Sequence, residues 1–320
     1  MCTAITDHHL FGRNLDLEYG YHEEAVILPR NYPIPFRQTN IMDAHFRIIG
    51  IATVDNGYPL FYDAMNEKGL CMAGLDFPDN AFYQSANDHL TNIAPFELIP
   101  WILCQCSSVQ EAKQLLSQTN LCDIRYSAQF PQSPLHWILA DSEESIVIEP
   151  MKNGLKIYDD PVGVLCNNPP FPFHLHHLAG YQHLSAGEQE NTFEGISLKP
   201  YGGGMGAIGL PGDFSSGSRF IKASFVKWHS KCPDQKDGAI TQFFHLLDTV
   251  AMPSGAIRVR GGQNEITRYC SCYDRRAGKL YFVTYHNRRI RAVSMDETAQ
   301  DKNKLIRYPM DDLQDFRYLN

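Results

Sequence analysis

Strand-like and helix-like segments follow one another in blocks along this chain, and they do not alternate one by one. Short apolar, β-branched runs bounded by polar turns fill the first third, at residues 2–6, 9–17, 24–29, 47–54, 58–64 and 70–75. Helical patterns follow at 95–103 and 109–116, strand texture returns at 136–149 and 155–167, helices at 218–231 and 241–252, and strands at 267–295. Segregated strands and helices argue against a doubly wound sheet and favour two stacked sheets flanked by helix pairs. We therefore predict an α+β fold.

Two amphipathic patterns predict a pair of adjacent helices in the last third of the chain. The segment 241–252 has an apolar stripe at i, i+3, i+4 and i+7 spacing, formed by Ile240, Phe243, Phe244, Leu247, Val250 and Ala251. Its predicted partner, 218–231, has three apolar residues in register, namely Ile221, Phe225 and Trp228. Earlier in the chain, residues 108–111 have the spacing of a capping box, and the uniformly apolar run 95–103 predicts a buried helix.

Composition limits the functions that this chain can have. It has 320 residues, 43% of them hydrophobic, and no long linker divides it, so we expect one domain over residues 1–320. The formal net charge is −8, and the densest basic cluster is the short segment 288–291, which argues against a nucleic-acid partner. The sequence contains neither an apolar run of about 18 residues nor a basic leader followed by an apolar stretch. We therefore expect a cytoplasmic protein without a membrane span.

The cysteines and histidines give no sign of a metal centre. Nine cysteines are present, an odd number, and none of them forms a CxxC pair. We therefore predict neither a disulfide framework nor a zinc site, and we interpret the CxC pairs at 104–106 and 270–272 as buried, inert thiols. His174, His176 and His177 lack an acidic or cysteine ligand at useful spacing, so we expect them on a surface or helix face. No cofactor is expected.

The N-terminus carries the strongest chemical signal. Cys2 directly follows the initiator methionine and is small enough for that methionine to be removed. The mature chain would then carry an α-amine and a thiol on one residue, with ordinary pKa values of about 8 and about 8.5. Such an amine can act as the general base for its own thiol, without a separate histidine. The alternative is an ordinary small residue at a frayed chain end.

The residues after Cys2 predict a strand pair. Segments 2–6 and 9–17 have strand texture and a polar turn joins them, so the terminus would be held in a sheet. Arg13 and Asp16 are three residues apart, which places them on opposite faces of an unbroken strand. If both serve one site, the strand must bulge or end between Asn14 and Asp16.

Several motifs follow one another in an order typical of one enzyme family. They are Met1-Cys2-Thr3, Phe11-Gly12-Arg13-Asn14 with Asp16, Asn66-Glu67-Lys68-Gly69-Leu70, Ala73-Gly74-Leu75-Asp76-Phe77-Pro78, Leu135-His136-Trp137, Gly163-Val164-Leu165-Cys166-Asn167-Asn168-Pro169, Gly209-Leu210-Pro211-Gly212-Asp213-Phe214 and Ser218-Arg219-Phe220. With these motifs the chain resembles the choloylglycine hydrolases, which are the bile salt hydrolases and penicillin V acylases of the N-terminal-nucleophile superfamily. The resemblance covers nearly the whole chain. It implies a four-layer αββα sandwich, in agreement with the order of the segments.

The resemblance also implies a set of catalytic residues. Cys2 would supply the nucleophile and, through its α-amine, the base, while Asp16 would hold and orient that amine. Arg13 and Arg219 would place positive charge near the thiolate. Arg219 lies at the start of a predicted helix, where a cation opposes the helix dipole, and this unfavourable placement points to function. The alternatives are a strand-end turn residue for Asp16 and a surface salt bridge for Arg219.

Two further positions would form an oxyanion hole. Asn167 follows a strand-like run and precedes Asn168 and two prolines; the resemblance makes its amide a donor, although local sequence alone fits a turn residue. Asn168 is disfavoured because the family motif places the donor directly after residue 166, which is Cys here where Thr is frequent. The second donor would be the backbone N–H of Asp76, at a position where bile salt hydrolases usually carry Asn and penicillin acylases Tyr. A carboxylate there would repel an oxyanion unless it points away or is protonated.

The resemblance therefore implies a cysteine amidase that cleaves glycine- or taurine-conjugated bile salts through a thioester. Penicillin V acylase is the alternative within the same chemistry, and the lack of an aromatic residue at position 76 weakly favours the bile-salt branch. A non-catalytic sterol-binding protein, disabled by Asp76, is the alternative from another class. In the family a segment corresponding to residues 181–201 pairs subunits, usually in a homotetramer; a mobile surface loop is the other interpretation.

Overall fold

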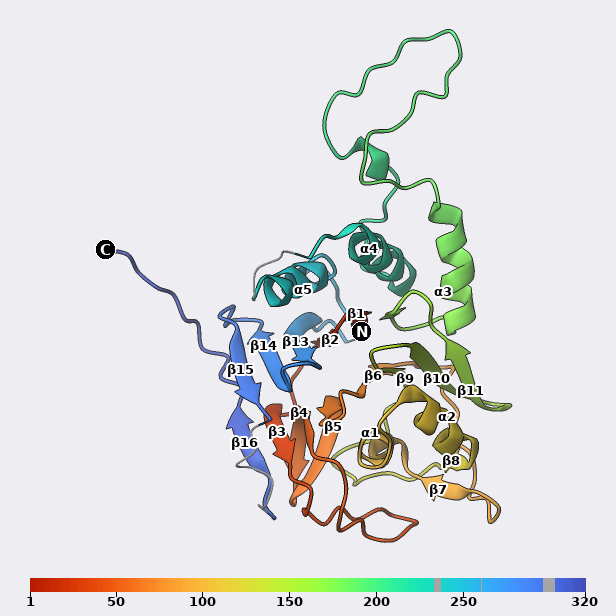
Figure 1. Cartoon of the computed structure of the whole chain (residues 1–320), viewed down its shortest axis with the longest axis vertical. Coiled ribbons are helices and arrows are strands. Elements are labelled where there is room, and N and C mark those ends of the chain that lie inside the picture. Colours follow the sequence, from red (N-terminus) through yellow and green to blue (C-terminus); the bar gives the residue numbers. More distant parts are fainter. Residues whose placement is uncertain (233–236, 260, 296–302) are drawn as a thin grey trace.

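The computed structural model describes residues 1–232, 237–259, 261–295 and 303–320. Two antiparallel sheets lie at its centre (Figure 1). The six-stranded sheet has the order β12 (Val164–Leu165), β1 (Cys2–Asp7), β2 (Leu10–Leu17), β13 (Ile266–Asp274), β14 (Lys279–Thr284) and β15 (Arg291–Ser294). The eight-stranded sheet has the order β11 (Gly154–Asp159), β10 (Ser145–Met151), β9 (Leu135–Ala140), β6 (Cys71–Asp76), β5 (Tyr58–Asn66), β4 (Ile48–Asp55), β3 (Glu24–Leu28) and β16 (Ile306–Pro309). A small parallel pair joins β7 (Thr91–Ile93) to β8 (Thr119–Leu121).

Helices cover the outer faces of both sheets (Figure 1). On the six-stranded sheet lie α4 (Ser216–His229) and α5 (Gly238–Asp248), with α3 (Phe171–Leu178) beside α4. On the eight-stranded sheet lie α1 (Leu98–Leu103), which continues the 3₁₀ turn η1 (Pro95–Glu97), and α2 (Val109–Ser117). Two further 3₁₀ turns are η2 (Ala179–Tyr181) and η3 (Met205–Ala207). Since β1 and β2 also contact β6 across the interior, the predicted αββα sandwich is confirmed.

Burial on both faces explains why the central strands are apolar at almost every position. In β4, Ile49 and Ile51 join the core between the sheets, whereas Ile48 and Ala52 join the core under α1 and α2. Successive side chains of a strand point to opposite faces, so a strand between two cores needs apolar residues in both series. Each such fully buried side chain contributes about 1.5–3 kcal/mol.

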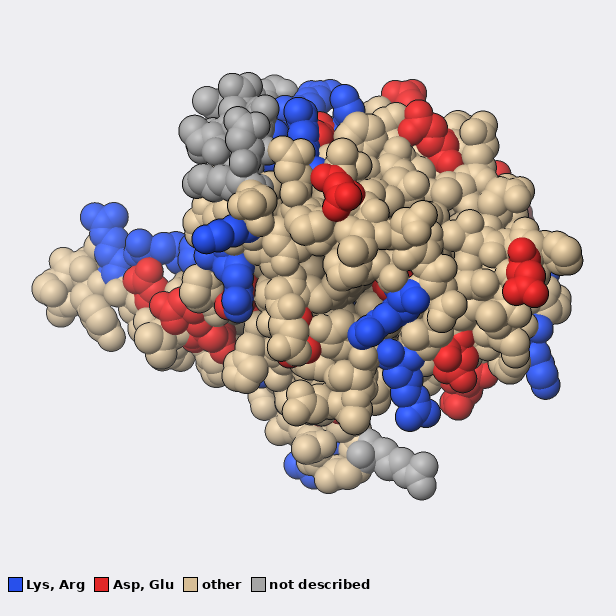
Figure 2. Space-filling view, turned by 90° about the horizontal axis from the view of Figure 1, so that it is seen from below, with Lys and Arg blue, Asp and Glu red and all other residues tan. Residues whose placement is uncertain are grey.

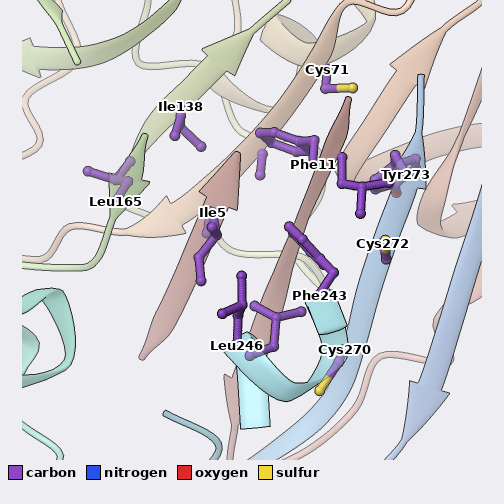
Figure 3. Packing of buried hydrophobic residues seen from close by; sticks show 14 of the residues in the cluster. Ile5, Phe11, Cys71, Ile138, Leu165, Phe243, Leu246, Cys270, Cys272 and Tyr273 are labelled. Atoms are coloured by element: carbon purple, nitrogen blue, oxygen red, sulfur yellow. The ribbon is translucent and has the colours of Figure 1, made fainter. Parts of the chain in front are cut away.

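The N-terminal hairpin lies inside the first of these cores. Figure 3 shows Ile5 of β1 and Phe11 of β2 within the same cluster as Phe243 of α5. All three side chains are at most 1% exposed. The predicted strand pair at the chain start is therefore confirmed, and its first residue is held by the surrounding packing.

Most predicted strand and helix segments occur, but α3 was not predicted and several details differ. The helix expected at 241–252 spans Gly238–Asp248, because the N–H groups of residues 249–251 donate to the carbonyls three residues before them and the last turn tightens. Trp228 is 63% exposed and lies under the ammonium of Lys227, so it does not belong to the buried face of α4. Strand β16 was not predicted; it pairs with β3 at the edge of the sheet.

The capping box before α2 is only half formed. The hydroxyl of Ser108 accepts a hydrogen bond from the Glu111 backbone at 3.2 Å, as the spacing predicts. The Glu111 carboxylate, however, accepts from the backbone N–H of Ser107 at 2.6 Å and not from residue 108. Ser108 is therefore the N-cap, as predicted, and only the reciprocal contact of Glu111 lies one residue earlier than predicted.

The surface carries both signs of charge. On the face shown in Figure 2, basic and acidic side chains lie interspersed. The chain around residues 185–204 extends away from the two sheets (Figure 1) and exposes Phe193 by 65% and Tyr201 by 88%. None of the helices in the described part of the chain has the length and apolar character needed to cross a membrane.

Candidate active site

Cys2 is the first residue of β1, and β1 lies between β2 and β12 in the six-stranded sheet. It pairs with Leu15 and is only 2% exposed. Its backbone N–H donates to Asn167 Oδ1 at 2.7 Å, and its carbonyl accepts from Arg219 at 2.5 Å. The chain end is therefore held on both sides, as a reactive group at a terminus requires.

Arg219 lies in the first turn of α4, where it connects three segments of the chain. Its guanidinium donates to the carbonyl of Cys2, to Thr3 Oγ1 at 2.6 Å and to Asn167 Oδ1 at 2.7 Å, while Nε donates to the carbonyl of Phe214 at 3.0 Å. The side chain is only 1% exposed, which rules out the surface salt bridge that local sequence allowed. Thr3, as the partner of this guanidinium, was not predicted as part of the site.

Asn167 lies next to the N-terminus, two residues after the end of β12. Its Oδ1 accepts from both Cys2 and Arg219, and these two donors fix the orientation of the carboxamide. Its Nδ2 therefore points the other way and donates to the carbonyl of Asp76 at 2.7 Å. His174, expected on a surface or helix face, is fully buried and donates to the carbonyl of Asn167 at 2.9 Å. Only its position seven residues after Asn167 could have indicated this contact.

Arg13 lies on the face of β2 that is turned toward the eight-stranded sheet. Its guanidinium donates to the carbonyls of Tyr62, at 3.2 Å, and of Gly74. Burial alone lowers the pKa of Arg13, but the charges of Cys2, Tyr269 and Asp63 outweigh it and raise the pKa above its ordinary value. The side chain is thus a permanent cation in the interior.

Asp16 lies on the opposite face of β2, as strand geometry predicts. β2 has no bulge between Asn14 and Asp16, because it pairs with β1 without interruption and the register shift lies in β13. Its Oδ1 accepts from the hydroxyl of Thr267 at 2.6 Å, and its Oδ2 has no hydrogen-bond partner among the described residues. Burial raises the pKa of Asp16, while the charges of Arg219 and the N-terminus lower it.

Met1 continues the strand pairing beyond Cys2. Its carbonyl accepts from Asp16 N–H at 3.0 Å, and its amine donates to the Asp16 carbonyl at 2.9 Å and to the carboxylate of Glu265. Glu265 is 2% exposed and was not predicted, because no local pattern marks it. The backbone nitrogen of Cys2 is a peptide nitrogen as long as Met1 is attached.

A pocket of about 200 Å³ opens between the sheets beside Cys2. Cys2, Arg13 and Asp76 lie together in its lining. The rest of its wall is mainly apolar and aromatic, formed by Leu15, Leu17, Tyr21, Leu60, Phe61, Tyr62, Pro95, Phe96, Ile124, Tyr126, Phe130, Pro131 and Leu135, with the polar residues Gln132 and Ser133 and the backbone of Gly74. A mostly apolar pocket with a few polar groups at one place is typical of a small-molecule site.

Asp76 is the last residue of β6 and is half-buried in the pocket wall. Burial raises the pKa of its carboxyl, while the positive charges of the N-terminus and of His136 lower it. The raised pKa reduces the repulsion that a carboxylate here would exert on a nearby anion.

The cysteines of both CxC pairs are buried, as predicted. Cys104, Cys106, Cys270 and Cys272 are all at most 3% exposed, and none of the nine cysteines forms a disulfide in the described chain. Burial raises the pKa of Cys104 and Cys270, the latter to about 12. Within the described residues, no cluster of three or more His, Cys, Asp or Glu side chains could hold a metal ion.

Comparisons with known proteins agree with this geometry. The family model described as linear amide C–N hydrolases, choloylglycine hydrolase family, matches residues 2–308. A bile salt hydrolase/transferase of Lactiplantibacillus plantarum is 49% identical over 314 residues, which are 97% of each chain, and one of Clostridium perfringens is 35% identical over 96% of each. A solved conjugated bile acid hydrolase variant from Clostridium perfringens has a TM-score of 0.91 at 33% identity, covering 100% of both chains. A penicillin V acylase from Agrobacterium tumefaciens has a TM-score of 0.77 at 15% identity, covering 98% of this chain and 94% of its own, and shares the fold. The chain thus belongs to the choloylglycine hydrolase family of linear amide C–N hydrolases.

Proposed function

We propose that this chain is a bile salt hydrolase, which cleaves the amide bond of glycine- or taurine-conjugated bile acids with Cys2 as its nucleophile. The observation that carries the proposal is the position of Cys2 in an apolar pocket, with its main chain held by Asn167 and Arg219. The apolar wall suits the ring system of a bile acid. The names of the relatives support the same substrate class.

The reaction requires the removal of Met1. The nitrogen of Cys2 then becomes a free α-amine, next to Asn167 Oδ1, and can accept the proton of its own thiol. The buried carboxylate of Asp16 compensates the positive charge that forms on this amine. Arg13, a cation in the same pocket, favours the thiolate.

The thiolate attacks the amide carbonyl, and the negative charge moves to the carbonyl oxygen. Asn167 Nδ2 and the backbone N–H of Asp76 stabilise this oxyanion. A single donor of this kind contributes about 10²–10³-fold to the rate. The glycine or taurine amine leaves with the proton from the Cys2 amine, and water then hydrolyses the thioester to release the free bile acid.

Subunit number and location are part of the proposal. A cytoplasmic homotetramer built from one domain over residues 1–320 agrees with the family resemblance. The exposed aromatic rings of Phe193 and Tyr201 on the projecting segment support a contact between subunits. Light scattering during size-exclusion chromatography measures the mass of the assembly. A monomer at micromolar concentration would contradict the proposed tetramer.

Turnover by the purified protein tests the central proposal. Its intact mass shows whether Met1 is absent, and mass spectrometry of the products compares glycocholate, taurocholate and penicillin V. We expect free cholate from the first two and no product from the Cys2→Ala variant. Turnover by Cys2→Ala, or by protein that retains Met1, contradicts the scheme. Preference for penicillin V favours the acylase, and a protein that binds bile salts without product favours a sterol-binding role.

A further inference from the structure

Two buried polar residues, His136 and Glu149, lie beside the pocket but not in its lining. His136 comes from β9 and Glu149 from the adjacent strand β10; both are 0% exposed. His136 Nδ1 donates to Glu149 Oε1 at 3.2 Å. Within the described chain, His136 Nε2 and Glu149 Oε2 have no hydrogen-bond partner. An apolar pair would fill this space without the desolvation penalty, so a polar pair here needs an explanation.

Glu149 holds the segment that carries Asn167. Its Oε1 also accepts from the backbone N–H of Phe171 at 2.9 Å. Phe171 is the first residue of α3 and follows Asn167 by four positions. One turn later in α3, His174 donates to the carbonyl of Asn167 at 2.9 Å. The position of α3, and through it that of Asn167, therefore depends on Glu149.

His136 holds the segment that carries Asp76. It pairs with Leu75 across the β6–β9 ladder, directly before Asp76. Its ring is stacked on Phe77, directly after Asp76, with ring centroids 4.2 Å apart and planes inclined by 5°. The backbone of His136 is thus paired with the residue before Asp76, and its ring is stacked on the residue after it.

We propose that His136 and Glu149 are positioning residues, a buried clip that sets the distance between Asn167 and the Asp76 backbone for binding the oxyanion. The inference rests on the proposed function, because it concerns the two groups assigned there to the oxyanion. The hydrogen bond from Asn167 Nδ2 to the Asp76 carbonyl joins the same two segments at the pocket. His136 and Glu149 join these two segments a second time, outside the lining of the pocket.

Loss of the clip acts on the transition state more than on substrate binding. We expect Glu149→Leu and His136→Leu to lower kcat by about 10–100-fold with KM changed less than about threefold, since a misplacement of about 1 Å costs on the order of 10² in rate. Glu149→Gln keeps an oxygen that can accept from Phe171 and from His136, so we expect it to regain most of kcat. His136→Phe keeps the stacking on Phe77 and loses the donor, and we expect an intermediate kcat.

A stability-matched control separates positioning from general loss of structure. Ile148→Ala removes a buried side chain of the same strand, β10, that belongs to the core under α1 and α2. We expect it to lower Tm without lowering kcat. The double variant His136→Phe with Glu149→Leu removes the buried polar groups; we expect its Tm to equal or exceed that of the wild type while kcat still falls.

These outcomes decide the proposal in either direction. The proposal is overturned if the loss of kcat is proportional to the loss of Tm, with the same proportion for the clip variants and for Ile148→Ala. It is also overturned if the clip variants change KM alone. If Glu149→Leu fails to fold, the double variant and His136→Phe decide by the same criterion. Failure of the proposed function is seen separately, as absence of bile salt turnover in the wild type or its persistence in Cys2→Ala.

Discussion

Replacement of Arg219 by Met removes the charged centre of the site while keeping a side chain of similar length. Four oxygen atoms lose a donor, on Cys2, Thr3, Asn167 and Phe214. Asn167 Oδ1 then retains only the N–H of Cys2. The carboxylate of Asp16 also loses the nearby positive charge that most strongly lowers its pKa.

The expected loss of stability follows from the burial of this guanidinium. Removing one partner from a buried charged network costs about 3–5 kcal/mol. An unfolding entropy of about 2 cal/mol/K per residue, taken over this chain, corresponds to a fall in Tm of roughly 5–8 °C. Because Asn167 loses one of the two donors that orient it, kcat should fall at least about tenfold at temperatures where the variant is folded.

Calorimetry and steady-state hydrolysis of glycocholate measure the two effects on one preparation. Arg219→Lys is a second variant that keeps the positive charge. Its ammonium cannot donate to several acceptors at once as the planar guanidinium does, so we expect its kcat to remain low. Lys222→Met, a partly exposed residue of the same helix, should leave Tm and kcat near the wild-type values. An Arg219→Met variant with wild-type Tm and kcat would refute the role assigned to this side chain.

Two other substitutions test different parts of the structure. Asn167→Ala should lower kcat by about 10²–10³-fold, the effect of losing one oxyanion donor, and initial rates at saturating substrate measure it; a loss below fivefold contradicts the assignment. The second substitution tests a buried carboxyl, that of Asp160. Burial raises its pKa to about 6, above its value in the unfolded chain. The stability that this raised pKa contributes is therefore complete below the unfolded pKa and is lost as pH rises through about 6. The Tm of Asp160→Asn minus that of the wild type should therefore increase as the pH is raised from pH 4 to pH 7.5. A Tm difference that does not change with pH contradicts the ionisation of a buried Asp160.

Local patterns were sufficient for most of the strands and helices, but they missed α3 and β16 and misplaced the end of α5. Segments such as 47–54 carry apolar residues at both the odd and the even positions. This pattern identifies a strand between two cores, because a strand needs apolar side chains on both faces only if both faces are buried. The end of α5 was misplaced because the apolar stripe continues through Val250, which is buried although the helix has already ended. Trp228 has the right spacing for a buried face, yet the neighbouring Lys227 covers its ring outside the core.

The site could be predicted only where the family resemblance supplied long-range information. Cys2 and Asn167 are 165 positions apart, and Thr3 and Arg219 are 216 apart, so no local period relates them. Glu265, His136 and the buried state of His174 were missed for the same reason: each contact depends on which strands and helices become neighbours in the fold.

Strand alternation also explains how one residue can serve two faces of the sheet. Arg13 and Asp16 lie on opposite faces of an unbroken β2, and the prediction that a shared role needs a bulge assumed a site on one face. Cys2 removes that need, because its side chain lines the pocket while its main chain, in the plane of the sheet, is reached by Arg219 from the helix layer. The pocket therefore lies on one face of the sheet, whereas the hydrogen bonds of Arg219 tie the N-terminal strand to α4 on the other.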